Sequence, residues 1–498
     1  MSADRWITDH EVSPRHPFYT RANAGEVLPD PASPLGWTIV WQATNDGWRD
    51  AQINVGTCEP DEVRSDEVVG SFGGYLYINA ALARLFGVRA PGLAPEMIDF
   101  TYFGDHPDVP PYVAEPWHES EANTAKVGAW MHQVLSEPLE VLLDDQVVAN
   151  ELRSTRPDLR DLADHELVER ARSMRPLLRL LFERHLTVTA GASIGPGIIS
   201  AVAEALGDPS LALDLITGIG DVDSALPSRA MWALSRLDEE SDEFRAGFTA
   251  FLAEFGSRGP NEWDIVSDVW ETKPELVLNL IAVMRKQGAE GDPATRTDAV
   301  AAQRAAATDR VRDALAADPG ASGQFEAGLA SAHRYLAGRE RTKTNIIKVV
   351  HEVRVALREL ARRHQYEVVD FHMLLDEELE AFLAAPDGFR SRLTQRASEY
   401  RALFELDPPF IVVDTVPPLS QWAKRADATV ASIADAGDVL TGVPGCPGTV
   451  TGVARVILDP SDPMALEPGD ILVAPHTDPA WTPLFVPAAG VVVKSGRR

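Results

Sequence analysis

Three charged residues in the second half of the chain have the types and spacing needed to handle a phosphoryl group. They are Arg339, Glu340 and Lys343. On a helix, Arg339 and Lys343 project from one face, with Glu340 beside Lys343. Arginine grips a phosphoryl group through two parallel hydrogen bonds, lysine adds a point charge, and glutamate accepts a hydroxyl proton or holds the two cations in place. From the spacing alone, a solvated lattice of salt bridges worth about 0.3–0.5 kcal/mol per pair is the more usual interpretation, and both interpretations stay open.

A second charged group, Arg258, Glu262 and Asp264, lies in a segment that cannot be one continuous helix. Two glycines and a proline between residues 256 and 260 interrupt it. Loops that bind ligands have this character, and we therefore take these three residues as candidate substrate-binding residues. A structural ion pair that fixes the loop is an equally good interpretation of the same pattern.

Other chemistry-bearing patterns are weaker. The glycine-containing segment Thr217–Ser224 lacks the lysine and the preceding strand of a phosphate loop, so we expect a loop that ends in a helix cap. Asp221 and Asp223 within it could bind a metal, but an exposed position in the loop is the simpler expectation. The histidines form no metal-binding pattern. Six aromatic residues near the N-terminus could line an apolar pocket, although a core role is more usual: Trp37, Trp41, Trp48, Phe72, Tyr75 and Tyr77.

The elements that must position these residues change in character along the chain. Up to about residue 120, turn signals are frequent, and we expect short strands, loops and one helix near Asn79–Phe86. From about Ala125 to Leu406 the spacing of apolar residues is helical, and Asn345–His364 is a long amphipathic helix. Many antiparallel helices around a shared core is the simplest architecture. The stretch Thr187–Ser200 is either a kinked helix junction, which we favour, or the lining of a cavity.

The C-terminal part has a different character. Three segments rich in β-branched residues predict strands, and Pro417-Pro418 marks a linker before them. These segments are Thr449–Leu458, Asp470–Ala474 and Gly490–Val493. They indicate a small α/β domain of about 60 residues, which is marginal for an independent core.

Composition limits the class of partner. The chain has 498 residues and a net charge of −29, which disfavours binding to nucleic acid or to anionic lipid. The two cysteines, Cys58 and Cys446, form no disulfide framework. The polar N-terminus has no signal core, and no run of about 18 apolar residues predicts a membrane span. We therefore expect a cytoplasmic protein whose partner is a small molecule.

The C-terminal segment closely resembles the mobile, swivelling phosphohistidine domain of the phosphoenolpyruvate-utilising enzymes, a family that includes phosphoenolpyruvate synthase and rifampin phosphotransferase. Four stretches carry this resemblance: Gly445–Val456, Glu467–Pro475, Thr477–Pro483 and Ala488–Val493. Upstream, further landmarks resemble the acceptor-binding region of the rifampin phosphotransferase branch in the same order: Ser33–Thr38, Gly73–Asn79, Phe251–Asp264, Val269–Trp270 and Arg339–Lys343.

The resemblance implies an α+β multidomain protein. We expect a loop- and strand-rich N-terminal part of the acceptor-binding domain at 1–124, its helical body at 125–414, a linker at 415–440, and an incomplete α/β swivelling domain at 441–498. In the family, a Ser-His pair follows the last strand, whereas this chain ends at Lys494–Arg498. We therefore assign no phosphohistidine, and we do not transfer that role to His476.

The resemblance also implies the function. We expect a component of an ATP-dependent phosphotransferase that binds a small hydroxylated or keto acceptor, with Arg339, Glu340 and Lys343 as catalytic residues. The chain carries no ATP-grasp domain, so ATP and Mg²⁺ would bind a separately encoded subunit, and no metal site is assigned here. Without that subunit and the histidine, the chain is expected to be inactive alone. The alternatives are a non-catalytic protein that binds a small molecule, and a defective gene fragment.

Overall fold

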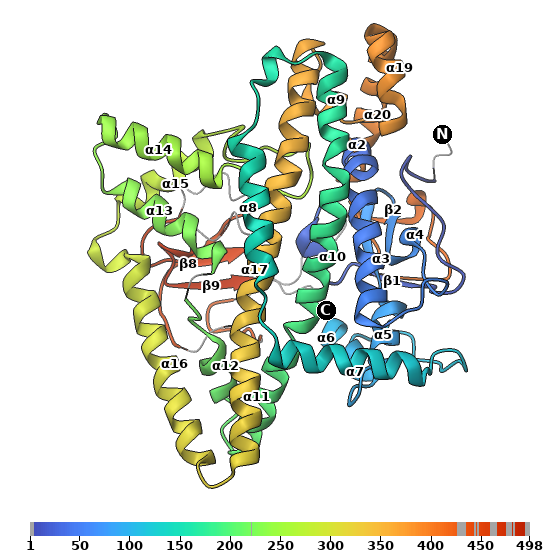
Figure 1. Ribbon diagram of the computed structural model, residues 1–498. Coiled ribbons are helices and arrows are strands. Elements are labelled where there is room, and N and C mark those ends of the chain that lie inside the picture. The colour runs from blue at the N-terminus through green and yellow to red at the C-terminus, as the bar shows by residue number, and fades with distance from the viewer. Residues whose placement is uncertain are drawn as a thin grey trace.

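The computed structural model describes residues 4–220, 222–425, 435–442, 445, 448–458, 466–474, 481 and 484–493. Two residues that the sequence analysis singled out, Asp221 and His476, lie outside these ranges, as do Cys446, most of Thr477–Pro483 and the residues after Val493. Helices dominate the described residues, and three small sheets accompany them (Figure 1). This composition fits the expected α+β class.

One helix, α17 (Pro319–Arg363), runs through the centre of the molecule (Figure 1). Its 45 residues begin after Asp318, whose side chain accepts hydrogen bonds from two backbone N–H groups of the first turn. The predicted amphipathic helix Asn345–His364 is confirmed as the C-terminal half of α17, and nearly every residue between Asn345 and Ala361 is buried. Helices from several parts of the chain therefore cover most of this half, and its polar side reaches solvent mainly in the last turn, at Arg362.

Four helices pack along α17: α8 (Val141–Ser154), α9 (Asp164–Ser173), α10 (Arg175–Gly191) and α11 (Ile194–Ala205). The predicted helix junction within Thr187–Ser200 is confirmed, because α10 ends and α11 begins there. Gly195 allows α11 to touch α17 backbone to backbone. A Cβ atom at this position would lie 2.4 Å from the backbone nitrogen of Ala332, so any larger residue would push the two helices apart.

The N-terminal layer is built on a four-stranded antiparallel sheet with the order β2-β3-β1-β5. Its strands are β1 (Phe18–Thr20), β2 (Val69–Phe72), β3 (Tyr75–Asn79) and β5 (Ile411–Val413). Tyr19 of β1 is paired with Asn79 of β3 on one side and with Val412 of β5 on the other. A strand that follows the helical body in sequence therefore joins the N-terminal sheet. The aromatic residues of this layer form the core, as expected, with Trp48 partly buried.

The prediction of one helix in this layer is wrong. The helix near Asn79 is present as α5 (Ala80–Arg89), but a π-helical turn at Trp37–Trp41 leads into the longer α3 (Gln42–Val55). All five residues of the π-helical turn are buried, so they show no amphipathic pattern that would have indicated a helix.

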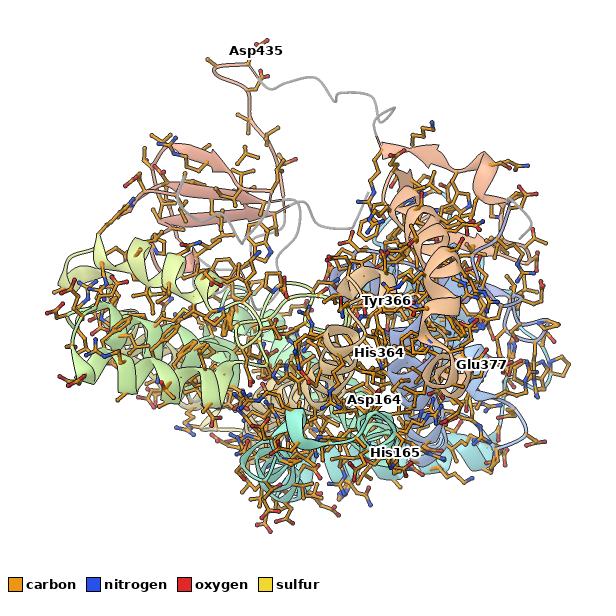
Figure 2. All side chains as sticks on the ribbon, turned by 90° about the horizontal axis from the view of Figure 1, so that it is seen from above. Asp164, His165, His364, Tyr366, Glu377 and Asp435 are labelled. Carbon is orange, nitrogen blue, oxygen red and sulfur yellow. The ribbon has the colours of Figure 1, made fainter. Side chains whose placement is uncertain are left out.

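The predicted C-terminal strands are confirmed as a separate parallel sheet. Its order is β7 (Ala454–Val456), β8 (Ile471–Ala474) and β9 (Gly490–Val493). One face packs on α13 (Leu226–Ser235), α14 (Asp242–Phe255) and α15 (Glu275–Arg285) and buries Leu472, Trp481 and Leu484 with them. Viewed from above, this sheet lies beside these helices and apart from the N-terminal layer (Figure 2). The C-terminal sheet is thus docked on the helical body.

Part of the expected linker 415–440 is bound to the body. Strand β6 (Ala423–Lys424) pairs with β4 (Leu406–Asp407), and Trp422 is buried against Tyr75. The attached segment therefore extends to residue 425, and residues 426–434 lie outside the described part of the chain. Asp435, on the other side of that gap, lies beyond the helices in Figure 2.

The remaining helices connect these units. They are α1 (Ala24–Val27), α2 (Pro34–Gly36), α4 (Ser65–Val68), α6 (Pro95–Phe103), α7 (Glu121–Ser136), α12 (Leu211–Ile216), α16 (Pro293–Leu315), α18 (Val368–Phe371), α19 (Leu379–Ala384) and α20 (Arg390–Leu403). The helical stretch Asp164–Ala205 contains a window that is long and apolar enough to cross a membrane by length and composition. This is weak evidence of a span, because core helices of soluble proteins pass the same test and α10 packs along α3 and α17.

A buried histidine makes the fold sensitive to acid. His372 is fully buried, and its Nδ1 lies 2.7 Å from the carbonyl oxygen of Val368. Burial lowers the pKa of His372 from 6.5 to about 3. Between these values the unfolded chain binds a proton that the folded chain does not, so stability falls as the pH drops below 6.5.

We predict that His372→Gln makes stability less dependent on pH. The loss of unfolding free energy between pH 7 and pH 4.5 should be smaller by about 2–3 kcal/mol than in the wild type. Urea denaturation at the two pH values measures it, and the same substitution at the exposed His132 is the matched control. An identical loss in wild type and His372→Gln would contradict the assignment.

Candidate functional site

The loop between α14 and α15 holds a buried ion pair. The Nε atom of Arg258 donates to Oε2 of Glu262 at 2.9 Å, and both side chains are at most 4% exposed. The backbone N–H of Gly259 donates to the same Oε2. Arg258 also donates from Nη1 to Oγ1 of Thr344 on α17, at 2.9 Å. The pair therefore fixes the loop to itself and to the central helix.

Lys343 of α17 completes this arrangement. Its Nζ lies 3.5 Å from Oε1 of Glu262, the carboxylate oxygen that Arg258 does not bind. We call Arg258, Glu262 and Lys343 the loop–helix ion cluster. It brings together residues from both charged groups of the sequence analysis, although Glu262 and Lys343 are about 80 residues apart. One carboxylate thus faces two cations in a largely buried setting, where charges are weakly screened.

Arg339 and Glu340 lie beside this cluster on α17. Arg339 is 46% exposed, and its Nη2 lies 3.7 Å from Oε1 of Glu340. Glu340 and Lys343 are each about one-fifth to one-quarter exposed. Arg339 is therefore the most solvent-facing cation of this helix segment, while Lys343 points toward the loop. All three side chains remain accessible to some degree.

His185 of α10 reports on the electrostatics of this segment. Its Nδ1 lies 2.9 Å from Oγ1 of Thr342. Burial, followed by the positive charges of Lys343 and Arg339, lowers the pKa of His185 to about 3. A neutral imidazole therefore lies next to two cations at neutral pH, and the field around them favours an anion.

Asp264 is held by the N-terminal layer instead. Its side chain is fully buried, and its two oxygens accept hydrogen bonds from the backbone N–H and the hydroxyl of Ser33, both at 2.7 Å. Ser33 caps α2, and a Cβ atom at Gly36 would lie 2.8 Å from Oδ1 of Asp264, so only glycine fits there. Burial raises the pKa of Asp264. The geometry makes Asp264 a joint between the loop and the N-terminal layer, and its predicted contact with substrate remains a prediction.

Side chains of α17 also bind the backbone of the same loop. Arg354, which is fully buried, donates from Nη2 to the carbonyl oxygens of Glu262, at 2.6 Å, and Asp264, at 3.2 Å. Further along the loop, Glu271 accepts from Nε2 of His351 at 2.6 Å and from Arg156 at 2.7 Å. Burial lowers the pKa of His351 to about 4, so this histidine is neutral at neutral pH. The loop is thereby anchored at three points along α17.

Sequence reasoning missed the residues of a small pocket next to Arg258. Ser257 and Lys348 line it, and no local pattern marks either residue in the sequence. Asp223 also lines it, which corrects the expected exposure of this residue. The Asp223 side chain is 5% exposed and lies 3.6 Å from Nη2 of Arg341. Its burial results from α17 covering the turn that precedes α13.

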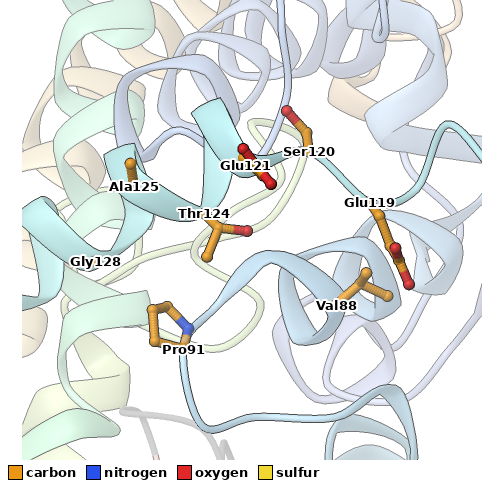
Figure 3. Close-up of a pocket in the computed structure, with 8 residues that line it drawn as sticks. All are labelled: Val88, Pro91, Glu119, Ser120, Glu121, Thr124, Ala125 and Gly128. Carbon is orange, nitrogen blue, oxygen red and sulfur yellow. The ribbon is translucent and has the colours of Figure 1, made fainter.

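A larger groove lies elsewhere, between the C-terminal end of α5 and the N-terminal turn of α7 (Figure 3). Its volume is about 650 Å³, and its lining includes Glu119 and Glu121 but no lysine or arginine. Two carboxylates without a cation repel a phosphoryl group, so the larger groove does not match the chemistry of α17. Among the described residues, no group of three or more histidine, cysteine or acidic side chains is arranged to hold a metal ion.

Comparison with known proteins places this geometry in context. Residues 233–340 match the family model described as the rifampicin phosphotransferase fourth domain. The matched range includes Arg258, Glu262, Arg339 and Glu340. An uncharacterized protein of Mycobacterium tuberculosis is 26% identical over 98% of this chain and 57% of its own length. A rifampicin phosphotransferase of Streptomyces sviceus is 30% identical over 51% of this chain and 29% of its own length.

A further relative has a different name. The prodigiosin synthesizing transferase PigC of Serratia marcescens is 28% identical over 52% of this chain and 29% of its own length. The chain thus spans a little over half of the mycobacterial relative and about three-tenths of the two named transferases.

The joint at Asp264 yields a prediction about stability. Asp264→Asn replaces one acceptor oxygen by an NH₂ group that faces the donors of Ser33, so the free energy of unfolding should fall by about 2–4 kcal/mol. Chemical denaturation measures it. The same change at the exposed Asp161 is the control and should cost less than about 0.5 kcal/mol. Equal stability of the two variants would show that the joint does not hold the loop.

Proposed function

Because the chain is related to the phosphoenolpyruvate-utilising enzymes, we propose that it is the acceptor-binding part of an ATP-dependent phosphotransferase. Its helical body binds a small hydroxylated or keto acceptor. The C-terminal sheet belongs to a swivelling domain that delivers a phosphoryl group from a phosphohistidine to that acceptor. ATP and Mg²⁺ bind an ATP-grasp unit that acts as a partner of this chain, and the complex works in the cytoplasm.

The observation that carries this proposal is the loop–helix ion cluster with Arg339 beside it. Lys343 and Arg339 lie one helical turn apart on the same helix, and burial together with the positive charges of both residues lowers the pKa of His185, which is therefore neutral. Phosphoryl transfer requires cations around the three equatorial oxygens and in-line positioning of the two reactants, with little covalent work from the protein. This segment supplies the cations on a rigid, buried support.

Each residue of the segment has a distinct role in the proposal. Arg339 is exposed enough to bind two oxygens of the phosphoryl group, and Lys343 contributes a point charge from the edge of the cluster. Glu340, within 3.7 Å of Arg339, accepts the proton of the attacking hydroxyl or holds Arg339 in place. Arg258 and Glu262 do not contact the ligand in this proposal. They hold Lys343 in position through the loop–helix ion cluster.

The C-terminal sheet suits the role of a carrier. Its three strands are parallel, so their carboxyl ends lie at one edge of the sheet, where α/β domains place their functional loops. The sheet touches the body through α13–α15 and through an ion pair between Lys286 and Glu467, at 3.2 Å. In this proposal the docked position is one of the two positions between which the carrier moves.

Binding of a phosphate ester tests the proposal. We predict that phenyl phosphate binds the wild-type chain, and that Arg339→Gln and Lys343→Gln each weaken its Kd about tenfold or more, since each removes a charge-assisted hydrogen bond. Isothermal titration calorimetry at low ionic strength measures the affinity. Arg312→Gln is the matched control, because Arg312 is a half-exposed arginine on α16 that is paired with Glu326.

The Arg339 variant is the cleaner of the two. Arg339 is exposed, whereas Lys343→Gln leaves the buried Glu262 with one cation fewer and lowers stability as well. If Arg339→Gln and Arg312→Gln change the affinity equally, or if phenyl phosphate does not bind the wild type, the proposed site is rejected.

A further inference from the structure

The small pocket beside Arg258 is enclosed by elements from four parts of the chain. They are α8, the turn Asp223–Ala225 with the start of α13, the end of α14 with the loop after it, and α17. The lining residues are Gln146, Asp223, Leu226, Glu254, Phe255, Ser257, Arg258, Thr344 and Lys348. Its free volume is about 20 Å³, which accommodates one group of the size of a water molecule or a hydroxyl.

Two buried polar atoms of this pocket have no hydrogen-bond partner among the described residues. They are Oδ2 of Asp223 and Oγ of Ser257. Asp223 and Ser257 are 6% and 2% exposed, so water at the surface does not reach them freely. Buried polar atoms in folded proteins are nearly always paired, because an unpaired one costs about 1–3 kcal/mol. The two atoms therefore call for a polar occupant.

The charges that line the pocket are already compensated. Arg258 is paired with Glu262, and Asp223 with Arg341. The Nζ of Lys348 donates to Oε1 of Glu254 at 2.9 Å and to Oδ1 of Asn150 at 2.6 Å. An added anion would face the carboxylate of Asp223, and an added metal cation would face Arg258 and Lys348. A neutral group is the occupant that neither side repels.

We propose that this pocket is a recognition subsite for a neutral hydroxyl group of the acceptor, distinct from the hydroxyl that receives the phosphoryl group. A hydroxyl donates one hydrogen bond and accepts two. It donates to Oδ2 of Asp223 and accepts from Oγ of Ser257, and the third N–H of Lys348 is a further donor. Leu226 and Phe255 provide an apolar wall for the carbon atoms next to that hydroxyl.

The pocket is connected to the phosphoryl site through shared residues. Arg258 and Thr344 line the pocket and bind each other, and Arg258 also binds Glu262 of the loop–helix ion cluster. An acceptor that reaches both places therefore carries at least two hydroxyl groups, as a dihydroxybenzene such as catechol does. This inference rests on the proposed function and specifies the class of acceptor.

The test compares two ligands that differ by one hydroxyl, catechol and phenol. We expect catechol to bind the wild-type chain about 10- to 100-fold more tightly than phenol, as measured by calorimetry or by ligand-observed NMR titration. Asp223→Asn and Ser257→Ala should each reduce this ratio about tenfold or more and leave the affinity for phenol unchanged. Having two variants on different elements keeps the test valid if one of them fails to fold.

Asp145→Asn is the matched control. Asp145 of α8 is also buried, is paired with Arg184, and has an Oδ2 atom without a partner among the described residues, but it does not line the pocket. This variant should keep the preference for catechol. Equal affinity for the two ligands in the wild type, or a preference that survives both pocket substitutions, overturns the proposal.

The outcome can be separated from that of the proposed function. Preference for catechol in a chain that does not bind phenyl phosphate would reject the phosphotransferase role and retain the subsite. Binding of phenyl phosphate through Arg339 without any preference for catechol would reject the subsite and retain the role.

Discussion

The buried carboxylate of Glu262 sets the strongest constraint on this structure. An isolated charge in a protein interior is costly, and it is tolerated only when cations and hydrogen-bond donors surround it with good geometry. Glu262 has Arg258 on one oxygen and Lys343 near the other, and the backbone N–H of Gly259 adds a third donor. The loop must therefore lie in one register against α17, because a shift of one residue would leave the carboxylate unpaired.

The helix α17 fixes the position of this loop and of the helices around it. Arg354 holds the carbonyl groups of the loop, while Glu352 accepts hydrogen bonds from Arg156, which follows the end of α8, and from Arg170 of α9, at 2.6 Å each. The bond between Asp264 and Ser33 carries the same loop into the N-terminal layer. The cations of the proposed site thus lie on α17, which is hydrogen-bonded to the loop, to neighbouring helices and, through the loop, to the N-terminal layer. Such mutual support keeps a charged site preorganised.

Much of the fold could be predicted from the sequence because its elements have regular local signals. The β-branched runs of the C-terminal part became β7, β8 and β9, and the apolar spacing after Asn345 became half of α17. The signal failed where burial is complete, as at Trp37–Trp41, because a helix buried on all sides shows no polar face.

The candidate site could be predicted only in part. The sequence singled out Arg258, Glu262 and Lys343, and the resemblance to a family linked the two segments, but spacing alone could not show that Lys343 faces Glu262 while Arg339 faces solvent. Asp264 was grouped with them because it is close in sequence, although its side chain is bound by Ser33. Ser257 and Lys348 gave no signal, since the contacts that bury them join distant parts of the chain.

The most direct measurement is a crystal structure of the chain with phenyl phosphate bound. The account predicts a phosphoryl group within hydrogen-bonding distance of the Arg339 guanidinium and the Lys343 ammonium group, with the pair Arg258–Glu262 unchanged behind them. A phosphoryl group bound elsewhere, for example in the groove between α5 and α7 of Figure 3, with no ligand at Arg339, would contradict it.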